Sequence, residues 1–308
     1  MFFVHHRRLF FILTGLLLGA SVLAVILIPP KLSIEFTGGS ILEVAYDDVR
    51  PELAGARERI IAAGIEEPSV RASGEKGITV RTHALTPDER DTMLAALSED
   101  GTYPLTELRF SSVGPSLGNE LATKALYAIA AVVLAIVLYL TFAFRGVSRP
   151  VPSWGYGLTA VVMLAIDIIV PTGFYAVYAY FTGVQVDTLF VIALLALLGY
   201  CVNDVIVIFD RVREHLRTNE ERHVVEPFEE TVGKSITETI GRSINTGLTI
   251  VLALAALAVL GGEATRSFAL VMMVGVAVGT FSSIARSAPL LIPVAAWVEK
   301  RAALKGKK

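Results

Sequence analysis

The sequence carries little charge and a single cysteine. Charged residues make up 18% of its 308 residues and the formal net charge is −2, whereas about 25% charge is usual in soluble domains. The balanced charge excludes a strongly basic protein that binds nucleic acid. One cysteine excludes a disulfide framework and a Cys-x-x-Cys metal cluster. Hydrophobic residues make up 54% of the sequence and the mean hydropathy is +0.62, which predicts a multi-span membrane protein with room for one small soluble domain.

Six apolar runs are long enough to cross a membrane as helices, because about 20 residues rising about 1.5 Å each span a hydrocarbon core of about 30 Å. The first run exceeds the roughly 7–15 residues of a signal-peptide core, so we expect a retained anchor. A long polar segment separates it from the other five. The predicted fold class is membrane α-helical with one plus five spans, over Leu9–Ile28, Ala125–Phe144, Tyr156–Tyr178, Leu189–Phe209, Ser243–Leu260 and Phe268–Pro289.

The distribution of basic residues predicts which side of the membrane each loop faces. Cytoplasmic segments of membrane proteins carry an excess of Lys and Arg. The loops around Ala179–Thr188 and Gly261–Ser267 carry only Arg266, so we expect them outside. Both termini and the polar turns that follow the second and fourth spans are then cytoplasmic. The basic residues of those segments are Arg7, Arg8, Arg145, Arg149 and those between Asp210 and Arg242 and between Trp297 and Lys308.

The polar segment at 31–122 is predicted to be an extracytoplasmic ferredoxin-like α+β domain. It has 9 basic and 16 acidic residues between Lys31 and Glu120, a net charge of −7, which makes it a poor ligand for nucleic acid or anionic lipid. His83 is isolated and no catalytic motif surrounds it, so a purely structural spacer is the alternative. The elements follow the order βαββαβ, over Ile41–Ala45, Pro51–Ala63 with proline in its first turn, Ser69–Ala72, Ile78–Thr82, Asp88–Leu97 and Leu105–Phe110.

The predicted organisation thus has four parts. Residues 1–30 form the cytoplasmic N-terminus and the first span, and 31–122 form the extracytoplasmic domain. Residues 123–298 form the bundle of the other five spans, and 299–308 form a basic cytoplasmic tail.

Two aspartates lie inside predicted spans, where a charge costs at least roughly 2.5–3.5 kcal/mol and usually faces the bundle interior. Asp167 lies near the middle of the third span, one turn before Pro171. Asp204 lies in the fourth span, about 7 Å from its centre towards the cytoplasm. Arg242 enters the fifth span from the same side and can reach inward, while Asn203 offers an amide. We expect Asp204 to bind and release a proton, with Arg242 setting its affinity.

Less specific readings of these residues stay open. A static ion pair, or a polar pair that only packs helices, is the alternative for Asp204. For Asp167 the two readings are balanced, because Pro171 frees backbone groups that a carboxyl can bond without exchanging a proton. Small residues spaced four apart let helices approach closely, and we expect helix packing at Gly15, Gly19, Gly275, Gly279 and Ser283.

Several compact motifs resemble the SecF family of protein translocase subunits, in the SecD/SecF group of the RND-like superfamily. The most specific is the fourth-span block, Gly199-Tyr200-Cys201-Val202-Asn203-Asp204 followed by Phe209-Asp210-Arg211-Val212-Arg213-Glu214. The others are Phe36-Thr37-Gly38-Gly39-Ser40, Gly114-Pro115-Ser116-Leu117-Gly118, the entry to the fifth span at Ser235–Ser243, and Gly261-Gly262, Phe268 and Gly275–Ser283 in the last hairpin. Together they cover nearly the whole sequence.

The resemblance implies a subunit, not an enzyme, that pairs with SecD and uses the proton-motive force to assist preprotein export on the outer side of the cytoplasmic (inner) membrane. The implied partners are SecD, the SecYEG translocon, SecA, YajC, the unfolded preprotein and the lipid bilayer, without nucleic acid. No metal or organic cofactor is implied; the coupling ion is H⁺, with Na⁺ left open. By position, the family's proton-path residues fall on Asp204, Arg242 and, in the third span, Asp167.

Several positions depart from the family pattern. Cys201 and Val205 replace hydroxyl residues beside Asp204, and Ser243 replaces the usual Thr after Arg242. Ile166 stands where a His often precedes the third-span aspartate, which weakens Asp167 as a proton site. Arg286 lies late in the sixth span, where a small or apolar residue is usual; it either snorkels to the cytoplasmic surface or competes with Arg242 for Asp204. These departures are Ile166, Cys201, Val205, Ser243 and Arg286.

Three other classes of protein fit part of the pattern. A half-size RND-type exporter of lipids or small molecules would share the proton relay, but such exporters usually have larger external domains. An intramembrane aspartyl protease needs two facing carboxylates in a Gly-x-Gly-Asp context, whereas the sequence here reads Val202-Asn203-Asp204. A purely structural scaffold would leave the buried charges without a function.

Overall fold

The computed structural model describes residues 2–99, 101–145 and 150–305. Within it the protein forms two compact units, Leu32–Tyr127 and the combination of Met1–Lys31 with Ala128–Lys308. Two parts of the predicted basic segments, Arg149 and the last three residues of the tail, lie outside the described residues.

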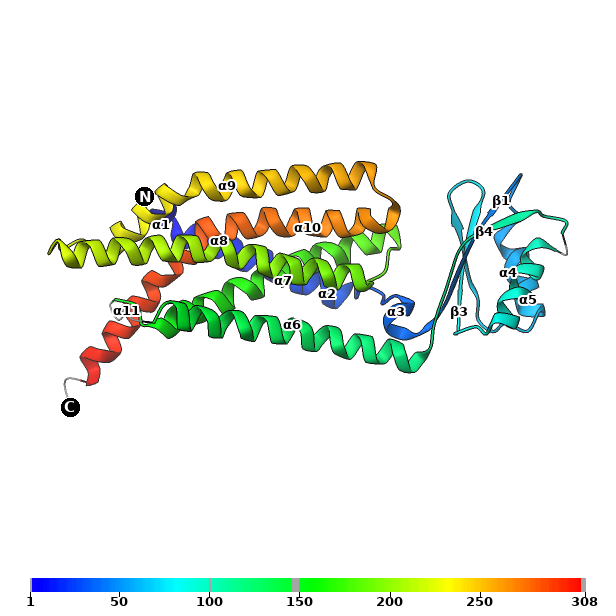
Figure 1. Cartoon of the computed structure of the whole chain (residues 1–308), viewed down its shortest axis with the longest axis horizontal. Helices are drawn as coiled ribbons and strands as arrows, with labels where there is room; N and C mark the ends of the chain where they lie inside the picture. Colours follow the sequence, from blue (N-terminus) through cyan, green and yellow to red (C-terminus); the bar gives the residue numbers. More distant parts are fainter. Residues whose placement is uncertain (1, 100, 146–149, 306–308) are drawn as a thin grey trace. The chain divides into compact units, whose positions relative to one another are not determined.

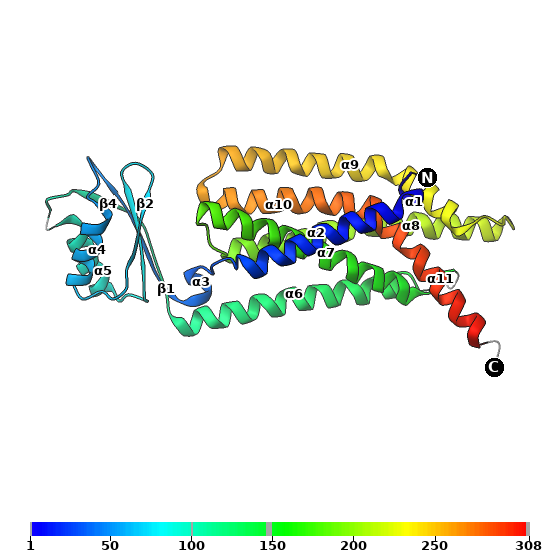
Figure 2. The ribbon, with the colours of Figure 1, turned by 180° about the vertical axis from the view of Figure 1, so that it is seen from behind.

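The first unit is a four-stranded antiparallel sheet with two helices on one face, as Figures 1 and 2 show from opposite sides. The strand order is β2-β3-β1-β4, which confirms the predicted ferredoxin-like domain. The short helix α3 (Ile34–Thr37) precedes the sheet. The elements are β1 (Gly39–Tyr46), α4 (Leu53–Ala62), β2 (Ser69–Ser73), β3 (Gly77–Thr82), α5 (Pro87–Ser98) and β4 (Leu105–Val113).

Alternating apolar residues hold the sheet and its helices together. Leu42 and Val44 of β1 are fully buried and pair with Val80 and Ile78 of β3. Their side chains contact the apolar faces of α4 and α5, because alternate residues of a strand point to the same face. One detail differs from the prediction: Pro51 lies before α4, which starts at Leu53 after the N-cap residue Glu52.

The second unit contains six helices long and apolar enough to cross a membrane, in the one-plus-five order that the sequence predicts. A short helix, α1 (Phe2–His5), precedes the first span. The sixth span is an interrupted helix in which a π-helical turn, η1, separates α10 from α11. The spanning elements are α2 (Arg7–Leu27), α6 (Pro115–Ala143), α7 (Ser153–Thr182), α8 (Thr188–Glu221), α9 (Phe228–Leu260), α10 (Glu263–Ser282), η1 (Ser283–Ser287) and α11 (Ala288–Lys305).

Burial differs greatly among these helices and defines the interior of the bundle. The most apolar stretches of α7 and of the sixth span are each 56% buried and that of α8 is 44% buried, whereas α6 buries only 6%. Polar groups on α7, α8 and α10 are therefore shielded from lipid by other helices. In Figure 1, α8 and α9 also extend beyond the apolar runs from which they were predicted, because their polar ends continue as helix.

Candidate functional site

Two carboxylates lie in the interior of the bundle. Asp167 of α7 is 1% exposed and Asp204 of α8 is 7% exposed. The Ser243 hydroxyl of α9 donates to Asp204 Oδ1 at 2.5 Å. Asp204 Oδ2 and both oxygens of Asp167 have no hydrogen-bond partner among the described residues. Because an unpaired carboxylate is costly in a buried site, these groups require a cation, a proton or a neighbouring subunit.

Arg242 was predicted to be the cation that faces Asp204, and the structure places it differently. It acts on Asp204 electrostatically, but the two side chains form no ion pair within 4.0 Å in the residues described. Successive residues of a helix point about 100° apart, so Ser243 faces Asp204 while Arg242 is exposed. The hydroxyl is thus the group that contacts Asp204, and this role was not predicted for Ser243.

Asn203 was predicted to offer its amide to Asp204, and the structure does not bring the two together. Asn203 is exposed, whereas Asp204 and Val205 are buried. The reason is the same helical geometry, since neighbouring residues of α8 lie on different faces. The inward neighbour of Asp204 on this helix is instead Cys201, three residues earlier.

Arg286 neither snorkels to the surface nor contacts Asp204. It lies in η1, is 2% exposed, and donates from Nη1 to Thr14 Oγ1 of α2 at 2.7 Å. Its Nη2 donates to the Val278 carbonyl of α10 at 3.5 Å. Asp167 is the carboxylate that acts on it electrostatically. Thr14 was not predicted as a site residue, although it is the first hydroxyl residue of an otherwise apolar run.

The predicted helix-packing residues fall into two groups. A Cβ atom at Gly275 would lie 2.3 Å from Leu197 Cδ2, and one at Gly279 would lie 2.3 Å from Cys201 Sγ, so α10 packs closely on α8 at both positions. The expectation for Gly15 and Gly19 was wrong within this protein, because a Cβ at either position meets nothing within 4 Å. The close approach of α2 to α7 occurs at Ser21 and Gly173 instead.

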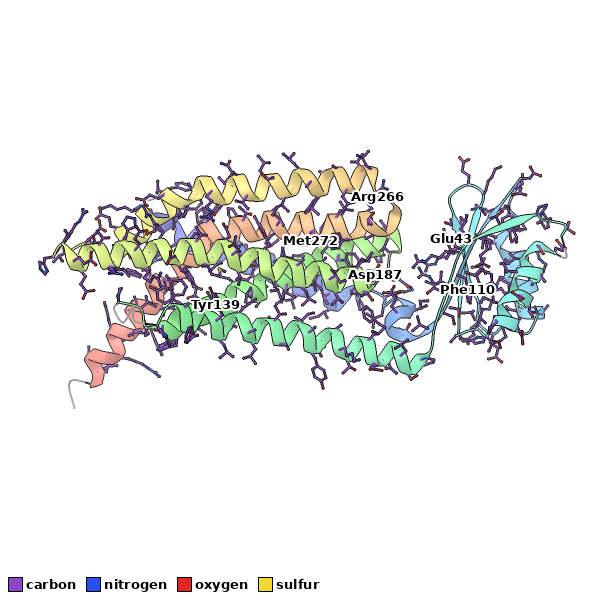
Figure 3. The ribbon with its side chains drawn as sticks, in the orientation of Figure 1. Glu43, Phe110, Tyr139, Asp187, Arg266 and Met272 are labelled. Carbon is purple, nitrogen blue, oxygen red and sulfur yellow. The ribbon has the colours of Figure 1, made fainter. Side chains whose placement is uncertain are left out.

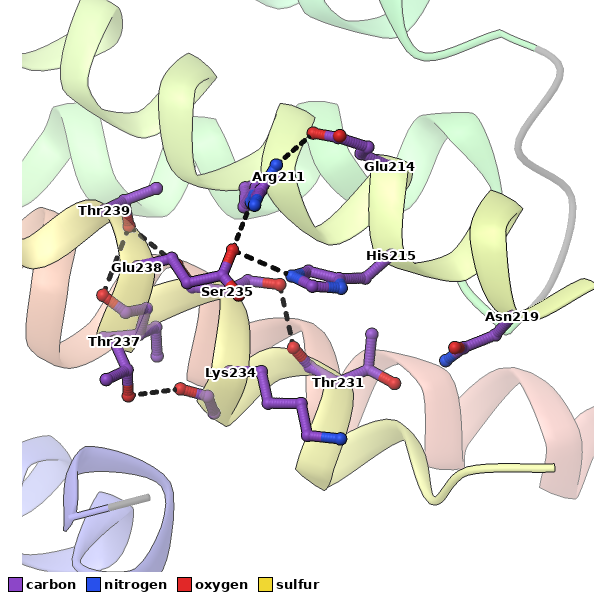
Figure 4. Close-up of polar contacts among 12 residues, drawn as sticks. Arg211, Glu214, His215, Asn219, Thr231, Lys234, Ser235, Thr237, Glu238 and Thr239 are labelled. Carbon is purple, nitrogen blue, oxygen red and sulfur yellow. Dashed lines mark hydrogen bonds and ion pairs between the residues drawn. The ribbon is translucent and has the colours of Figure 1, made fainter. Parts of the chain in front are cut away.

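The fourth-span motif continues into a polar cluster between α8 and α9, shown in Figure 4. Glu238 of α9 accepts a hydrogen bond from Arg211 Nε and pairs with His215 Nε2 at 3.1 Å. Arg211 also binds Glu214 at 2.5 Å. Asp210 pairs with Arg213 along the same helix. These contacts connect the two helices about one turn before Arg242 and Ser243.

At the opposite end of the bundle, the side chains of Asp187 and Arg266 bond backbone groups at helix ends (Figure 3). The Asp187 carboxylate accepts from the Phe190 backbone N–H at 2.9 Å at the start of α8. Arg266 donates from Nε to the Ala258 carbonyl at 3.1 Å, which ties the start of α10 to the end of α9. Between the two ends, the Tyr200 and Thr280 hydroxyls are 2.9 Å apart and connect α8 to α10.

The glycine motif after the first span forms a tight turn in the smaller unit. Gly38 and Gly39 have φ of +76° and +126°, which favour residues without a Cβ. A Cβ at Gly38 would lie 2.7 Å from Pro115 Cα, and one at Gly118 would lie 2.6 Å from Gly38 N. Phe36 is buried beside them. The two quoted motifs around Gly38 and Gly118 are therefore one structural feature, in which the start of β1 packs on the start of α6.

Comparison with known proteins gives consistent matches. The family model described as "Protein export membrane protein SecD/SecF, C-terminal" matches residues 94–297. Protein translocase subunit SecF of Thermobaculum terrenum is 34% identical over 94% of this chain and 92% of its own length. The SecF of Anaerolinea thermophila is 36% identical over 93% of this chain and 91% of its own.

Solved structures agree with the sequence matches. The crystal structure of SecDF from Thermus thermophilus, described as a translocon-associated membrane protein, superposes with a TM-score of 0.78 at 29% identity. It covers 95% of this chain, which spans 38% of the SecDF chain. SecDF in a super-membrane-facing form gives a TM-score of 0.66 over 99% of this chain and 40% of its own. The chain therefore belongs to the SecF family of protein translocase subunits.

Proposed function

We propose that this SecF protein uses the proton-motive force to assist preprotein export, and that Asp204 is the carboxyl that binds and releases the proton. The observation that carries the proposal is the site of Asp204, which is buried in the bundle with one oxygen bonded to Ser243 and the other without a partner among the described residues. The coupling ion in this proposal is H⁺, which a buried carboxyl binds directly, and Na⁺ is the alternative.

Protonation of Asp204 changes the charge of the bundle interior and therefore the stability of alternative helix arrangements. A charge in the bilayer core costs at least roughly 2.5–3.5 kcal/mol unless it is compensated. Moving one charge through 100 mV supplies about 2.3 kcal/mol, which is enough to shift a two-state equilibrium by more than tenfold. Arg242 acts on Asp204 electrostatically, and a rotation of α9 that turned Arg242 towards α8 would bring its guanidinium nearer to the carboxylate.

The partner in this proposal is SecD. This protein matches well under half of the SecDF chain, and the remainder of that protein would correspond to a separate partner subunit here. The largely exposed α6 and α9 leave apolar surface for helices of another subunit. Preprotein, SecYEG, SecA and YajC are further proposed partners, because the Thermus protein is described as translocon-associated.

We place the protein in the cytoplasmic (inner) membrane with both termini inside. The support is the positive-inside rule: the polar cluster of Figure 4 includes Arg211 and lies at the end of the bundle rich in basic residues. The ferredoxin-like unit is then extracytoplasmic, where it would contact SecD or the emerging preprotein. Its net charge of −7 between Lys31 and Glu120 favours contact with a basic or neutral polypeptide over anionic lipid.

The test replaces Asp204 with asparagine, which removes the negative charge and keeps the size and shape of the side chain. Vesicles that contain the translocon, SecD and the Asp204→Asn variant should lose proton-driven completion of preprotein export and proton uptake, while the variant remains folded. Glu220→Gln is the matched control, because this carboxylate lies on the same helix but is exposed. Proton-driven export by Asp204→Asn at the rate of the unchanged protein would refute the proposal.

A further inference from the structure

Helices α4 and α5 cover only one face of the sheet in the smaller unit, as Figures 1 and 2 show from opposite directions. Leu42 and Val44 of β1 point to the covered face and pack against these helices. Glu43, which lies between them, points to the other face, because successive residues of a strand face opposite sides of a sheet. This second side is called the open face below.

Three arginines lie on the open face. Arg71 of β2 lies opposite Thr79 of β3. Thr79 and Arg109 of β4 flank Glu43 of β1 on its two sides, so these four residues form one row across the sheet. Arg81 lies two residues after Thr79 on β3 and therefore on the same face. With strands about 4.8 Å apart, Arg71 is about 14 Å from Arg109 and, as a diagonal neighbour, about 7–8 Å from Arg81.

The arginines of the open face form no ion pair within 4.0 Å in the part of the chain that the structure describes, where the arginine ion pairs of this unit involve α4 and α5. Arg71 and Arg109 are exposed, whereas Arg81 is half-buried. The Arg81 Nε has no hydrogen-bond partner among the described residues. Glu43 lies opposite Arg109, but its carboxylate accepts from the Ser73 hydroxyl of β2 at 2.6 Å. The charge of the three arginines is therefore available to a ligand.

The charge of the unit is unevenly distributed as a result. Three of the 9 basic residues and one of the 16 acidic residues between Lys31 and Glu120 are strand residues of the open face. This leaves a net charge of +2 on the open face and −9 on the rest of the segment. Burial and the neighbouring Arg71 both lower the pKa of Arg81, which shows that the two guanidinium groups repel one another. The open face thus attracts an anion, although the unit as a whole is acidic.

The spacing of the arginines matches an extended acidic polypeptide. Alternate residues of an extended segment point to the same side and lie about 6.6–6.8 Å apart, close to the separation of Arg71 and Arg81. Arginine binds a carboxylate through two parallel N–H···O bonds. A flat anionic membrane surface fits less well, because it would also meet Glu43 and the acidic remainder of the unit.

We propose that the open face of the sheet binds an extended polypeptide segment with acidic residues at alternate positions, whose carboxylates are held by Arg71, Arg81 and Arg109. The binding itself does not depend on proton exchange. Only the identification of the segment as part of SecD or of a preprotein rests on the proposed function.

The test uses a fluorescent peptide of alternating Glu and Thr residues, added to the purified full-length protein in a nonionic detergent. Binding is measured by fluorescence anisotropy. The peptide should bind, and its affinity should fall as the salt concentration rises, because salt screens exposed charges. The same peptide with Gln in place of Glu should bind at least roughly tenfold more weakly, since the contacts depend on carboxylates. Equal binding of the two peptides would overturn the inference.

Matched variants locate the binding on the open face. Arg71→Gln and Arg109→Gln replace exposed residues and should each weaken binding of the Glu peptide by roughly threefold, and the double variant by roughly tenfold. Glu43→Gln removes the acidic residue of the row and should strengthen binding by roughly threefold, which a loss of folding could not imitate. Arg57→Gln, on the exposed side of α4, is the matched control and should leave the affinity unchanged. Equal losses in Arg57→Gln and Arg109→Gln would overturn the inference.

Two further measurements separate this inference from its alternatives. Detergent micelles that contain phosphatidylglycerol are the second probe; if the arginines bind these micelles and not the Glu peptide, the ligand is a lipid and the inference is wrong. Asp204→Asn should bind the Glu peptide as the unchanged protein does, even though it should lose proton-driven export. Failure of the open face to bind and failure of the proposed proton coupling are therefore distinguishable.

Discussion

The contact between α2 and α7 gives a sharp test of the packing. A Cβ atom at Gly173 would lie 2.5 Å from Ser21 Cβ, 2.6 Å from Ser21 Cα and 2.9 Å from the Ser21 carbonyl oxygen. Non-bonded carbon atoms prefer separations of about 3.5–4.0 Å. Gly173→Ala therefore requires the two helices to separate by about 1 Å at this point, because two of the three atoms belong to the backbone and cannot rotate away.

The expected loss of stability follows from this geometry. Overpacking of a buried contact costs about 1–3 kcal/mol, and we expect the upper part of that range because a backbone must move. For a protein of this class, each kcal/mol lowers the melting temperature by about 2–4 °C. Thermal unfolding of the purified protein, followed by intrinsic fluorescence, should thus show Gly173→Ala melting about 6–12 °C below the unchanged protein.

Two companion variants complete the test. Gly19→Ala on the facing helix α2 adds the same methyl group where nothing lies within 4 Å, and it should not lower the melting temperature. Ser21→Gly/Gly173→Ala removes the Cβ contact but leaves the backbone contacts, so it should stay destabilised. A neutral Gly173→Ala, or full recovery in the double variant, would refute the close approach of the two backbones.

The ferredoxin-like unit supports two further predictions, both measured by hydrogen exchange in the full-length protein. Thr86→Ala removes the capping box of α5 and should lower the stability of this helix by about 1 kcal/mol. The Thr86 backbone hydrogen bond also lowers the pKa of Glu89, so the protection of α5 from hydrogen exchange should weaken as pH falls through that pKa. Protection that does not change with pH would contradict this. Burial raises the pKa of Tyr46 to about 12, and its hydroxyl donates to the Leu97 carbonyl at 3.2 Å. Its contribution to stability is thus complete below about pH 10 and is lost as pH rises towards 12, and Tyr46→Phe should abolish that alkaline loss.

Sequence patterns predict this fold well wherever the local hydropathy of a segment decides whether it forms a helix or a strand. An apolar run of membrane length forms a helix whatever its neighbours are, so the six spans are predictable. Strands such as β1 and β3 are predictable from alternation, since Leu42 and Val44 must face one side. The polar ends of α8 and α9 escape the same reasoning, because hydropathy detects only the part of a helix that suits lipid.

Contacts between helices are predictable only where the partner is known. Gly15 and Gly19 have the spacing of a packing face, yet the approach of α2 occurs at Ser21, because Gly173 of α7 lies opposite that residue. Thr14 and Arg286 are 272 residues apart and form one hydrogen bond. The burial of Asp204 follows from its cost in lipid, but whether Ser243 or Arg242 faces it depends on the rotation of α9.

The hydroxyl partner of Asp204 suits the proton exchange that is proposed for this carboxyl. A hydroxyl can donate to a carboxylate and can accept from a carboxylic acid, so Ser243 can stay bonded to Asp204 in either protonation state. Arg286 is bonded to Thr14 and to the Val278 carbonyl, and it forms no ion pair with Asp167 within 4.0 Å among the described residues. An arginine at position 243 would instead hold Asp204 charged, because a guanidinium only donates and keeps its charge. The role proposed for Asp204 thus depends on the chemistry of its neighbour as well as on its depth in the membrane.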